Sequence, residues 1–392
     1  MTSEKSSSSI LWVQVAGLAG LQAAITLTWL VYNAYLPQLL AQFGFPATLA
    51  AGLLVIENAL AVILEPVMGG LSDQTRFKIG TSFPFVSLGV ILASALFIAI
   101  PCIVTFVPPL EVLKGILPLT LVAWAIAMTI FRSPAIAFLG RYSTPKELPL
   151  AASLVTLAGG VVGAFRGYAN QFILSLGAVW SFAIASFVLL AAAFTLRFFN
   201  PPETPTAEHS EKPQLPYKNL ALIFPTGLSI ALGTRFLFDA LGKILKIQLP
   251  TSDIGLVMLW VGLVFAFAAL PAGFMGSKIG NSRTMLIGIG ATILGIGSML
   301  YIGALFPIIF IFAGFSLIVN GVIPFCLYLM PPKWAGLGIG IYFGGFSLAM
   351  SGFGVMFPKA EVITPGFGVV GTTLAFLVAG VCIFLTQRNA EV

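Results

Sequence analysis

The sequence is poor in charge: charged residues make up only 8% of its 392 positions. Soluble domains carry about 25% charged residues, so this chain cannot cover a globular surface in water. It also lacks segments of about ten residues that alternate between apolar and polar, which excludes the strands of a membrane barrel. Hydrophobic residues make up 58% of the chain and lie in long runs. Because a spanning helix needs roughly 20 apolar residues, we expect an all-α integral membrane protein.

Residue types that commonly bind metals or attack substrates are scarce as well. There are one histidine and three cysteines, the cysteines lie in separate apolar runs without CxxC spacing, and no P-loop pattern occurs. We therefore expect no enzymatic activity, no metal site, no bound cofactor and no ATP-driven pumping.

The apolar runs predict twelve spanning helices in two sets of six. An N-terminal bundle is expected over residues 1–199 and a C-terminal bundle over 218–392. The proline- and glutamate-rich segment 200–217 between them has the composition of a cytoplasmic linker. The predicted helices cover residues 11–40, 48–70, 83–107, 114–139, 149–172, 176–199, 218–242, 253–275, 283–305, 307–330, 336–357 and 366–386.

Lysine and arginine residues orient this predicted bundle. With both termini on the cytoplasmic side, twelve of the 19 basic residues lie on that side, four on the outer side and three inside helices. Such a bias is typical of cytoplasmic loops and explains the net charge of +6 without a nucleic-acid partner. We expect a monomeric multi-pass protein of a bacterial inner (plasma) membrane, with the lipid bilayer, a small-molecule substrate and a coupling cation as its partners.

Two glycine-containing segments indicate an internal repeat. The loop expected after the second helix runs from Gly69 to Gly80, and the loop expected after the eighth runs from Gly273 to Arg283. Asp73 and Ser277 hold similar places 204 residues apart, close to half the chain. Parallel repeats of this kind build one large class of secondary transporters. We predict that the first segment is a gating loop, with these residues: Gly69, Asp73, Arg76 and Gly80.

The Gly69-x-x-x-Asp73 pattern resembles the signature of the major facilitator superfamily. The stretches Glu65–Asp73 and Phe131–Leu139, with Asn58, resemble its sucrose-transporter and glycoside-pentoside-hexuronide cation symporter branches. The resemblance implies a secondary active transporter for a sugar or glycoside, coupled to protons or sodium, that works by alternating access. Related branches handle pigments or assist the assembly of photosynthetic complexes, and this alternative stays open.

Six charged residues stand out inside predicted helices, where a charge costs about 2.5–3.5 kcal/mol and usually faces a cavity or a partner. Three acids and three arginines suggest mutual neutralisation: Glu57, Glu65, Arg132, Arg166, Arg235 and Asp239. Glu57, in the middle of its helix, is the first candidate for proton coupling, and Asp239 is the second. Alternatively, Glu57 is a permanent hydrogen-bonded acid or the ion-pair partner of Arg132 or Arg166. Arg235 and Asp239 are four residues apart, so they are expected to pair, with a gating or substrate role as the alternative.

A polar face on the first predicted helix indicates a solute cavity. Gln22, Thr26, Trp29 and Asn33 are spaced by four, three and four residues, which places them on one side of a helix. Amide and hydroxyl groups next to an aromatic ring suit a hydroxyl-rich solute, although interhelical hydrogen bonding would also explain them. The remaining candidates for the cavity lie on other helices: Trp124, Arg132, Arg166, Arg235 and Asn320.

Overall fold

The computed structural model describes residues 10–46, 48–107, 114–167, 169–201, 215–303, 305–358 and 362–390. We call the described residues up to 201 the first half and those from 215 the second half. Twelve helices of at least 17 residues run through these ranges, and no strand occurs in them. They are α1 Trp12–Gln42, α2 Thr48–Ile79, α3 Phe83–Phe106, α4 Ile116–Ala137, α6 Leu148–Ala164, α8 Ala178–Phe199, α9 Tyr217–Gln248, α10 Ile254–Ile279, α11 Asn281–Ser298, α12 Leu305–Leu329, α13 Ala335–Met356 and α14 Pro365–Ala390.

Short helices join some of these elements: α5 Leu139–Tyr142, η1 Pro145–Glu147, α7 Ala169–Ser175 and η2 Pro332–Trp334. Eleven helical segments of the described residues are long and apolar enough to cross a membrane. Of the twelve long helices, α11 alone is not among them. Its first turn, residues 281–284, is entirely polar, which lowers the mean hydropathy of its 18 residues.

The structure corrects several predicted boundaries. The segments 69–80 and 273–283, expected as loops, are largely helical, because α2 continues to Ile79 and α10 to Ile279. Each helix stops at a glycine with positive φ, 82° at Gly80 and 97° at Gly280, a conformation that favours glycine. The predicted helix 149–172 is divided between α6 and α7, and the one predicted over 283–305 ends at Ser298. The expected linker 200–217 lies mostly outside the described residues.

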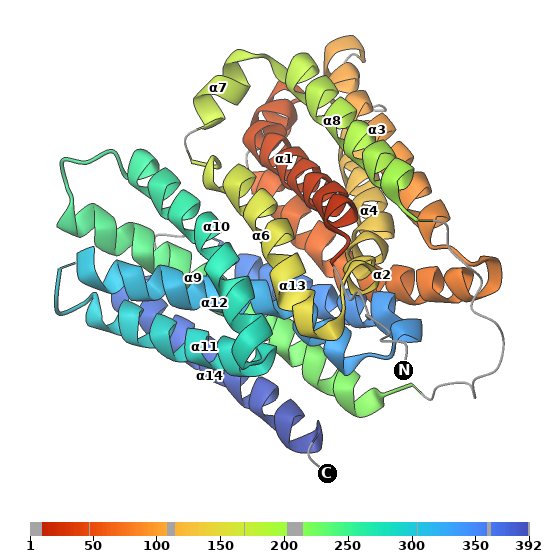
Figure 1. Cartoon of the computed structure of the whole chain (residues 1–392). Helices are drawn as coiled ribbons and strands as arrows, with labels where there is room; N and C mark the ends of the chain where they lie inside the picture. Colours follow the sequence, from red (N-terminus) through yellow and green to blue (C-terminus); the bar gives the residue numbers. More distant parts are fainter. Residues whose placement is uncertain are drawn as a thin grey trace.

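The two halves meet along two main pairs of helices, α2 with α13 and α6 with α10. Figure 1 shows α6 lying beside α10. Glycines allow this close approach: a Cβ on Gly340 would lie 2.3 Å from the Glu65 carbonyl oxygen, and a Cβ on Gly262 would lie 2.7 Å from Cβ of Ala164. Small residues at helix crossings are typical of packing in membranes, where no hydrophobic force drives helices together.

Candidate functional site

Glu57 is a buried carboxylic acid in the N-terminal part of α2, with 4% of its surface exposed. The Tyr32 hydroxyl on α1 donates a hydrogen bond to its Oε1. Its Oε2 has no hydrogen-bond partner among the described residues, and no cation pairs with the carboxyl there. One oxygen is therefore fixed while the other is open to a proton or a solute donor.

A small cavity of about 30 Å³ lies against Glu57. Its lining comes from α1, α2, α4 and, through Ser347, from α13 of the second half. A water molecule needs about 10–15 Å³ of such space, so in this conformation the cavity is the size of a few waters. The lining residues are Trp29, Glu57, Asn58, Ala61, Glu65, Ala125, Met128, Thr129, Arg132 and Ser347.

The second buried acid, Glu65, has a partner at each of its two carboxyl oxygens. Its Oε1 lies 2.5 Å from Nη2 of Arg132 on α4, and the Ser133 hydroxyl donates to Oε2. The Arg132 guanidinium carbon also lies 4.1 Å from the ring centroid of Phe343 on α13. The predicted neutralisation is therefore found between Glu65 and Arg132. Ser133 and Phe343 complete a cluster that spacing alone could not assemble, since its members lie on three helices.

Three aromatic rings form a wall behind Glu57. Tyr32 and Trp124 are stacked with ring centroids 4.4 Å apart, and Trp29 meets Trp124 edge-on at 4.8 Å. Trp29 lines the cavity. Trp124 is completely buried behind the other two rings and does not line this cavity.

The predicted polar face of α1 is divided in the structure. Only Trp29 of its four members lines the cavity. Gln22 and Thr26 pack against α6, where a Cβ on Gly159 would lie 3.1 Å from Cγ of Gln22 and 3.4 Å from Oγ1 of Thr26. Asn33 is exposed and donates to the Trp29 carbonyl at 2.6 Å. The polar groups on this face therefore mainly serve helix packing and the backbone of α1.

The charges of α9 pair differently from the prediction. Asp239 accepts from Lys243 at 2.7 Å instead of pairing with Arg235, and Lys243 also donates to the Ile363 carbonyl at 2.5 Å. An acid that precedes its base by four residues has the better helical geometry, which explains the choice. Arg235 lies 5.0 Å from the ring centroid of Phe353, and both it and Arg166 are exposed. Among the described residues neither arginine forms an ion pair, so the predicted mutual neutralisation is not found for these two.

One end of the bundle, which we call the basic end, contains the α2–α3, α4–α6, α10–α11 and α12–α13 connections. Here the Asp73 carboxylate accepts from the backbone N–H groups of Gly336 at 3.0 Å and Leu337 at 2.8 Å. An acid at the start of α13 is favoured by the free N–H groups and the helix dipole. A Cβ on Gly69 would lie 2.2 Å from the Gly336 carbonyl oxygen, so glycine is needed for this contact. Gly69 and Asp73 thus join the two halves.

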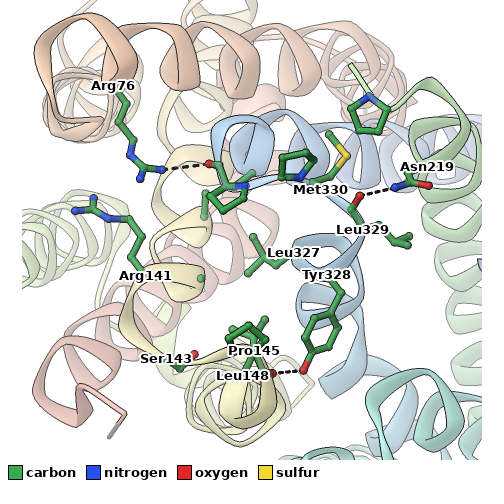
Figure 2. Close-up of a pocket in the computed structure, with 16 residues that line it drawn as sticks. Arg76, Arg141, Ser143, Pro145, Leu148, Asn219, Leu327, Tyr328, Leu329 and Met330 are labelled. Carbon is green, nitrogen blue, oxygen red and sulfur yellow. Dashed lines mark hydrogen bonds between the residues drawn. The ribbon is translucent and has the colours of Figure 1, made fainter. Parts of the chain in front are cut away.

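Further hydrogen bonds join the halves at the basic end, as Figure 2 shows. Arg76 donates to the Pro332 carbonyl at 3.3 Å, and the Tyr328 hydroxyl donates to the Pro145 carbonyl. A third, outside this view, runs from Asn320 to the Pro149 carbonyl at 3.0 Å. Asn320 thus ties α12 to α6 and does not line the cavity beside Glu57. Nothing in the helix pattern had singled out Tyr328, because its partner is a backbone group in the other half.

A larger cavity of about 580 Å³ lies among these basic-end contacts (Figure 2). Its lining comes from the ends of α2, α4 and α12, the start of α9, and the α4–α6 and α12–α13 connections, and includes neither of the buried glutamates. We therefore place the candidate solute site at the smaller cavity, where the unpaired carboxyl lies. Nearer the opposite end, Ser351 donates to the Val55 carbonyl at 3.1 Å. The polar contacts described here hold the halves together mainly at the basic end.

Solved structures with the same fold span nearly the whole chain. A bacterial homologue of the iron transporter ferroportin in an outward-facing state aligns with a TM-score of 0.75 and 15% identity, covering 96% of this chain and 99% of that one. The Escherichia coli fucose:proton symporter FucP aligns with a TM-score of 0.69 and 12% identity, covering 96% of this chain and 99% of that one. The human organic anion transporter MFSD10 aligns with a TM-score of 0.65 and 13% identity, covering 96% of this chain and 98% of that one.

At these identities the structural likeness establishes the fold alone. No curated protein sequence matches the chain. The sequence profile of the Major Facilitator Superfamily matches residues 18–355, well over half of the chain. With its many apolar helices, two mutually packed halves and buried charges, the chain therefore belongs to the Major Facilitator Superfamily of membrane transporters.

Proposed function

We propose that this chain is a secondary active transporter that moves a small hydroxyl-bearing solute, a sugar or glycoside, by alternating access and with protons as the coupling ion. The observation that carries the proposal is the state of the Glu57 carboxyl. It is buried, one oxygen is held by Tyr32, and the other is without a partner among the described residues. Glu65, on the same helix, is by contrast committed to Arg132.

The energetics of the membrane interior link the charge of Glu57 to the conformation of the carrier. A charged carboxylate there costs about 2.5–3.5 kcal/mol on insertion scales, and protonation removes the charge. The carrier can therefore reorient more readily when Glu57 is protonated, and the proton leaves when the cavity opens to water. Such a link makes the solute follow the proton gradient, because each state of Glu57 favours a different step.

The chemistry of the cavity suits a hydroxyl-rich solute. Asn58, Thr129 and Ser347 offer amide and hydroxyl groups, and Trp29 offers a ring for an apolar sugar face. Ser347 belongs to the second half, so a solute that binds it draws the halves together. The similarity to the fucose:proton symporter is one of fold and gives the proposal support by analogy only. The sucrose-transporter and glycoside-pentoside-hexuronide branches stay our proposed placement within the superfamily.

We further propose twelve spanning helices, with α11 as the twelfth, in two six-helix bundles over residues 1–199 and 218–392. The basic end is assigned to the cytoplasm of a bacterial inner membrane, with both termini on that side, because cytoplasmic loops are enriched in lysine and arginine. With the polar contacts concentrated at the basic end, the structure then corresponds to a carrier closed toward the cytoplasm. A single chain contains both halves, so a monomer suffices for transport.

The test is uptake into proteoliposomes that hold the purified protein, with a panel of radiolabelled sugars and an imposed proton gradient. Glu57→Gln should abolish accumulation against a gradient while exchange of internal for external solute survives. Glu147→Gln, in the η1 connection, is the control and should accumulate as the wild type does. Normal accumulation by Glu57→Gln would show that coupling does not pass through Glu57. Failure of the wild type to move any sugar would refute the sugar assignment.

A further inference from the structure

Three residues that line the cavity beside Glu57 each have one buried polar atom without a partner. The atoms are Nε1 of Trp29, Oε2 of Glu57 and Nε of Arg132, and among the described residues none of them has a hydrogen bond or an ion pair. Buried polar atoms in proteins are nearly always hydrogen-bonded, so each exception calls for an explanation. The three residues belong to α1, α2 and α4, so three helices bring them to one cavity.

Neighbouring side chains fix the two donor residues. The Trp29 ring meets the Trp124 ring edge-on, with centroids 4.8 Å apart. Nη2 of Arg132 lies 2.5 Å from Glu65, and the guanidinium carbon lies 4.1 Å from the ring centroid of Phe343. None of these contacts supplies an acceptor to Nε1 of Trp29 or to Nε of Arg132. Both N–H groups are therefore held in place without an acceptor.

The chemistry of the three atoms defines the group that completes them. An indole N–H and a guanidinium N–H only donate, whereas Oε2 of Glu57 accepts when the carboxyl is ionised and donates when it is protonated. A hydroxyl group donates one hydrogen bond and accepts two. Two neighbouring hydroxyls can therefore accept from all three atoms when Glu57 is protonated and can donate to it when it is ionised. A single hydroxyl accepts from only two donors, and a carbonyl or ether oxygen cannot donate.

The size of the cavity also fits two hydroxyl oxygens. Its volume is about 30 Å³, and an oxygen the size of a water molecule needs about 10–15 Å³ of such space. The carbon skeleton of a solute needs further room. Movement between the halves can supply it, because Ser347 of α13 forms part of the lining.

We propose that Trp29, Glu57 and Arg132 bind two hydroxyl groups on adjacent carbons, a 1,2-diol, and thereby determine which hydroxyl-bearing solutes the chain carries. The assignment of this diol to the transported solute rests on the proposed transport function, whereas binding of a diol by the purified protein does not. The two N–H groups recognise the diol in either charge state of Glu57. Recognition and proton coupling thus use different atoms of one site.

Two position isomers test the recognition of adjacent hydroxyls. 1,2-Cyclohexanediol and 1,4-cyclohexanediol have the same atoms and the same ring, and only the first has its hydroxyls on neighbouring carbons. Their affinities are measured by calorimetry on the purified full-length protein, in a detergent without sugar headgroups and a buffer without glycerol. The 1,2 isomer should bind about tenfold more tightly or better, because only it gives acceptors to both buried N–H groups.

Two tryptophans offer a matched pair of variants. Trp29→Phe keeps an aromatic ring but removes Nε1–H, so most of the preference for the 1,2 isomer should be lost. Trp124→Phe also removes a buried Nε1–H without a partner, but from a residue that does not line the cavity, so the preference should stay. Arg132→Lys keeps a cation beside Glu65 but removes Nε–H, and it too should lose the preference. It lies on another helix and decides the question if Trp29→Phe does not fold.

Equal affinities of the wild type for the two isomers would overturn the proposal and indicate a site for water alone. An unchanged preference in Trp29→Phe and Arg132→Lys, or an equal loss in Trp124→Phe, would overturn the assignment to the two N–H groups. Glu57→Gln should keep the preference, since its amide can still donate, although it uncouples transport. No proton gradient or solute flux enters this measurement, so a failure of the proposed transport function cannot produce any of these results.

Discussion

At the scale of single residues, the two glutamates of α2 show how partners divide the roles of identical side chains. They lie eight residues apart, about two turns, and both are buried. Glu65 meets an arginine and a serine, and so its charge is compensated in place. Glu57 meets a tyrosine, which supplies one hydrogen bond and no charge. The first is suited to hold the fold together and the second to change its protonation state.

The Glu65–Arg132 pair should therefore govern stability. Arg132→Gln leaves a buried carboxylate without its cation, and removal of one partner of a buried pair typically costs about 3–5 kcal/mol. We expect a clear loss of thermal stability in detergent, followed by the fluorescence of a thiol-reactive dye. The double variant Glu65→Gln with Arg132→Gln removes both charges and should recover much of that loss. A single variant as stable as the wild type would contradict the structural role.

At the scale of elements, the contact between α2 and α13 depends on glycines that let backbone atoms meet. Gly69→Ala would place a Cβ 2.2 Å from the Gly336 carbonyl oxygen, so α13 must move away at the basic end. We expect a longer distance between spin labels at Lys146 and Lys278, which lie at this end on different halves. The matched control is Gly70→Ala, whose Cβ would meet only Cδ1 of Leu337 at 3.6 Å, an ordinary contact. Equal distances in the two variants would show that this glycine does not control closure.

The helices themselves could be predicted from sequence, because each span must be long and apolar whatever its neighbours are. Their ends were harder to place. Glycines and basic residues after Gly69 are typical of a loop, yet nothing there prevents a helix until Gly80, and α2 runs on to Ile79. Helical periodicity indicates which residues share a face but not what that face meets. For that reason the α1 face could be recognised, while its division between α6 and the Glu57 cavity could not.

Ion pairs, too, could be predicted only as far as residue spacing allows, because spacing does not identify the partner on another helix. The spacing of Arg235 and Asp239 allows a pair, but Lys243 has the same spacing on the other side and the better orientation. The partners of Glu57 and Glu65 lie on other helices, so only the folded arrangement identifies them. Glu57 itself could be singled out from sequence, since an acid in the middle of an apolar helix is costly without a function.

At the scale of the whole molecule, coupled transport requires a defined orientation in the membrane. In intact cells, a cysteine at Lys246 should react with a membrane-impermeant maleimide, whereas one at Lys278 should react only after the membrane is made permeable. The background for this test replaces the native cysteines, Cys102, Cys326 and Cys382, which are all free thiols. The reverse pattern would show that the basic end faces outward and would invert the proposed direction of closure.

The two ends of the molecule are held by different forces. Hydrogen bonds from Asp73, Arg76 and Tyr328 join the halves at the basic end. Nearer the other end the Ser351 hydroxyl donates to the Val55 carbonyl at 3.1 Å, and glycine lets α6 and α10 pack closely at Gly262. A carrier works by exchanging such contacts between its ends, so that closure of one accompanies opening of the other. Protonation of Glu57, between the two ends, is the step that we expect to shift this balance.

Alternating access controlled by Glu57 is best tested by paired distance measurements across both ends. One spin-label pair is placed at Lys146 and Lys278 and the other at Gln42 and Lys246, in nanodiscs, at low and high pH and in Glu57→Gln. Alternating access predicts two populations in which the first distance lengthens as the second shortens. Glu57→Gln should show the low-pH distribution at every pH. Distances that stay fixed, or that lengthen together at both ends, would contradict alternating access controlled by Glu57.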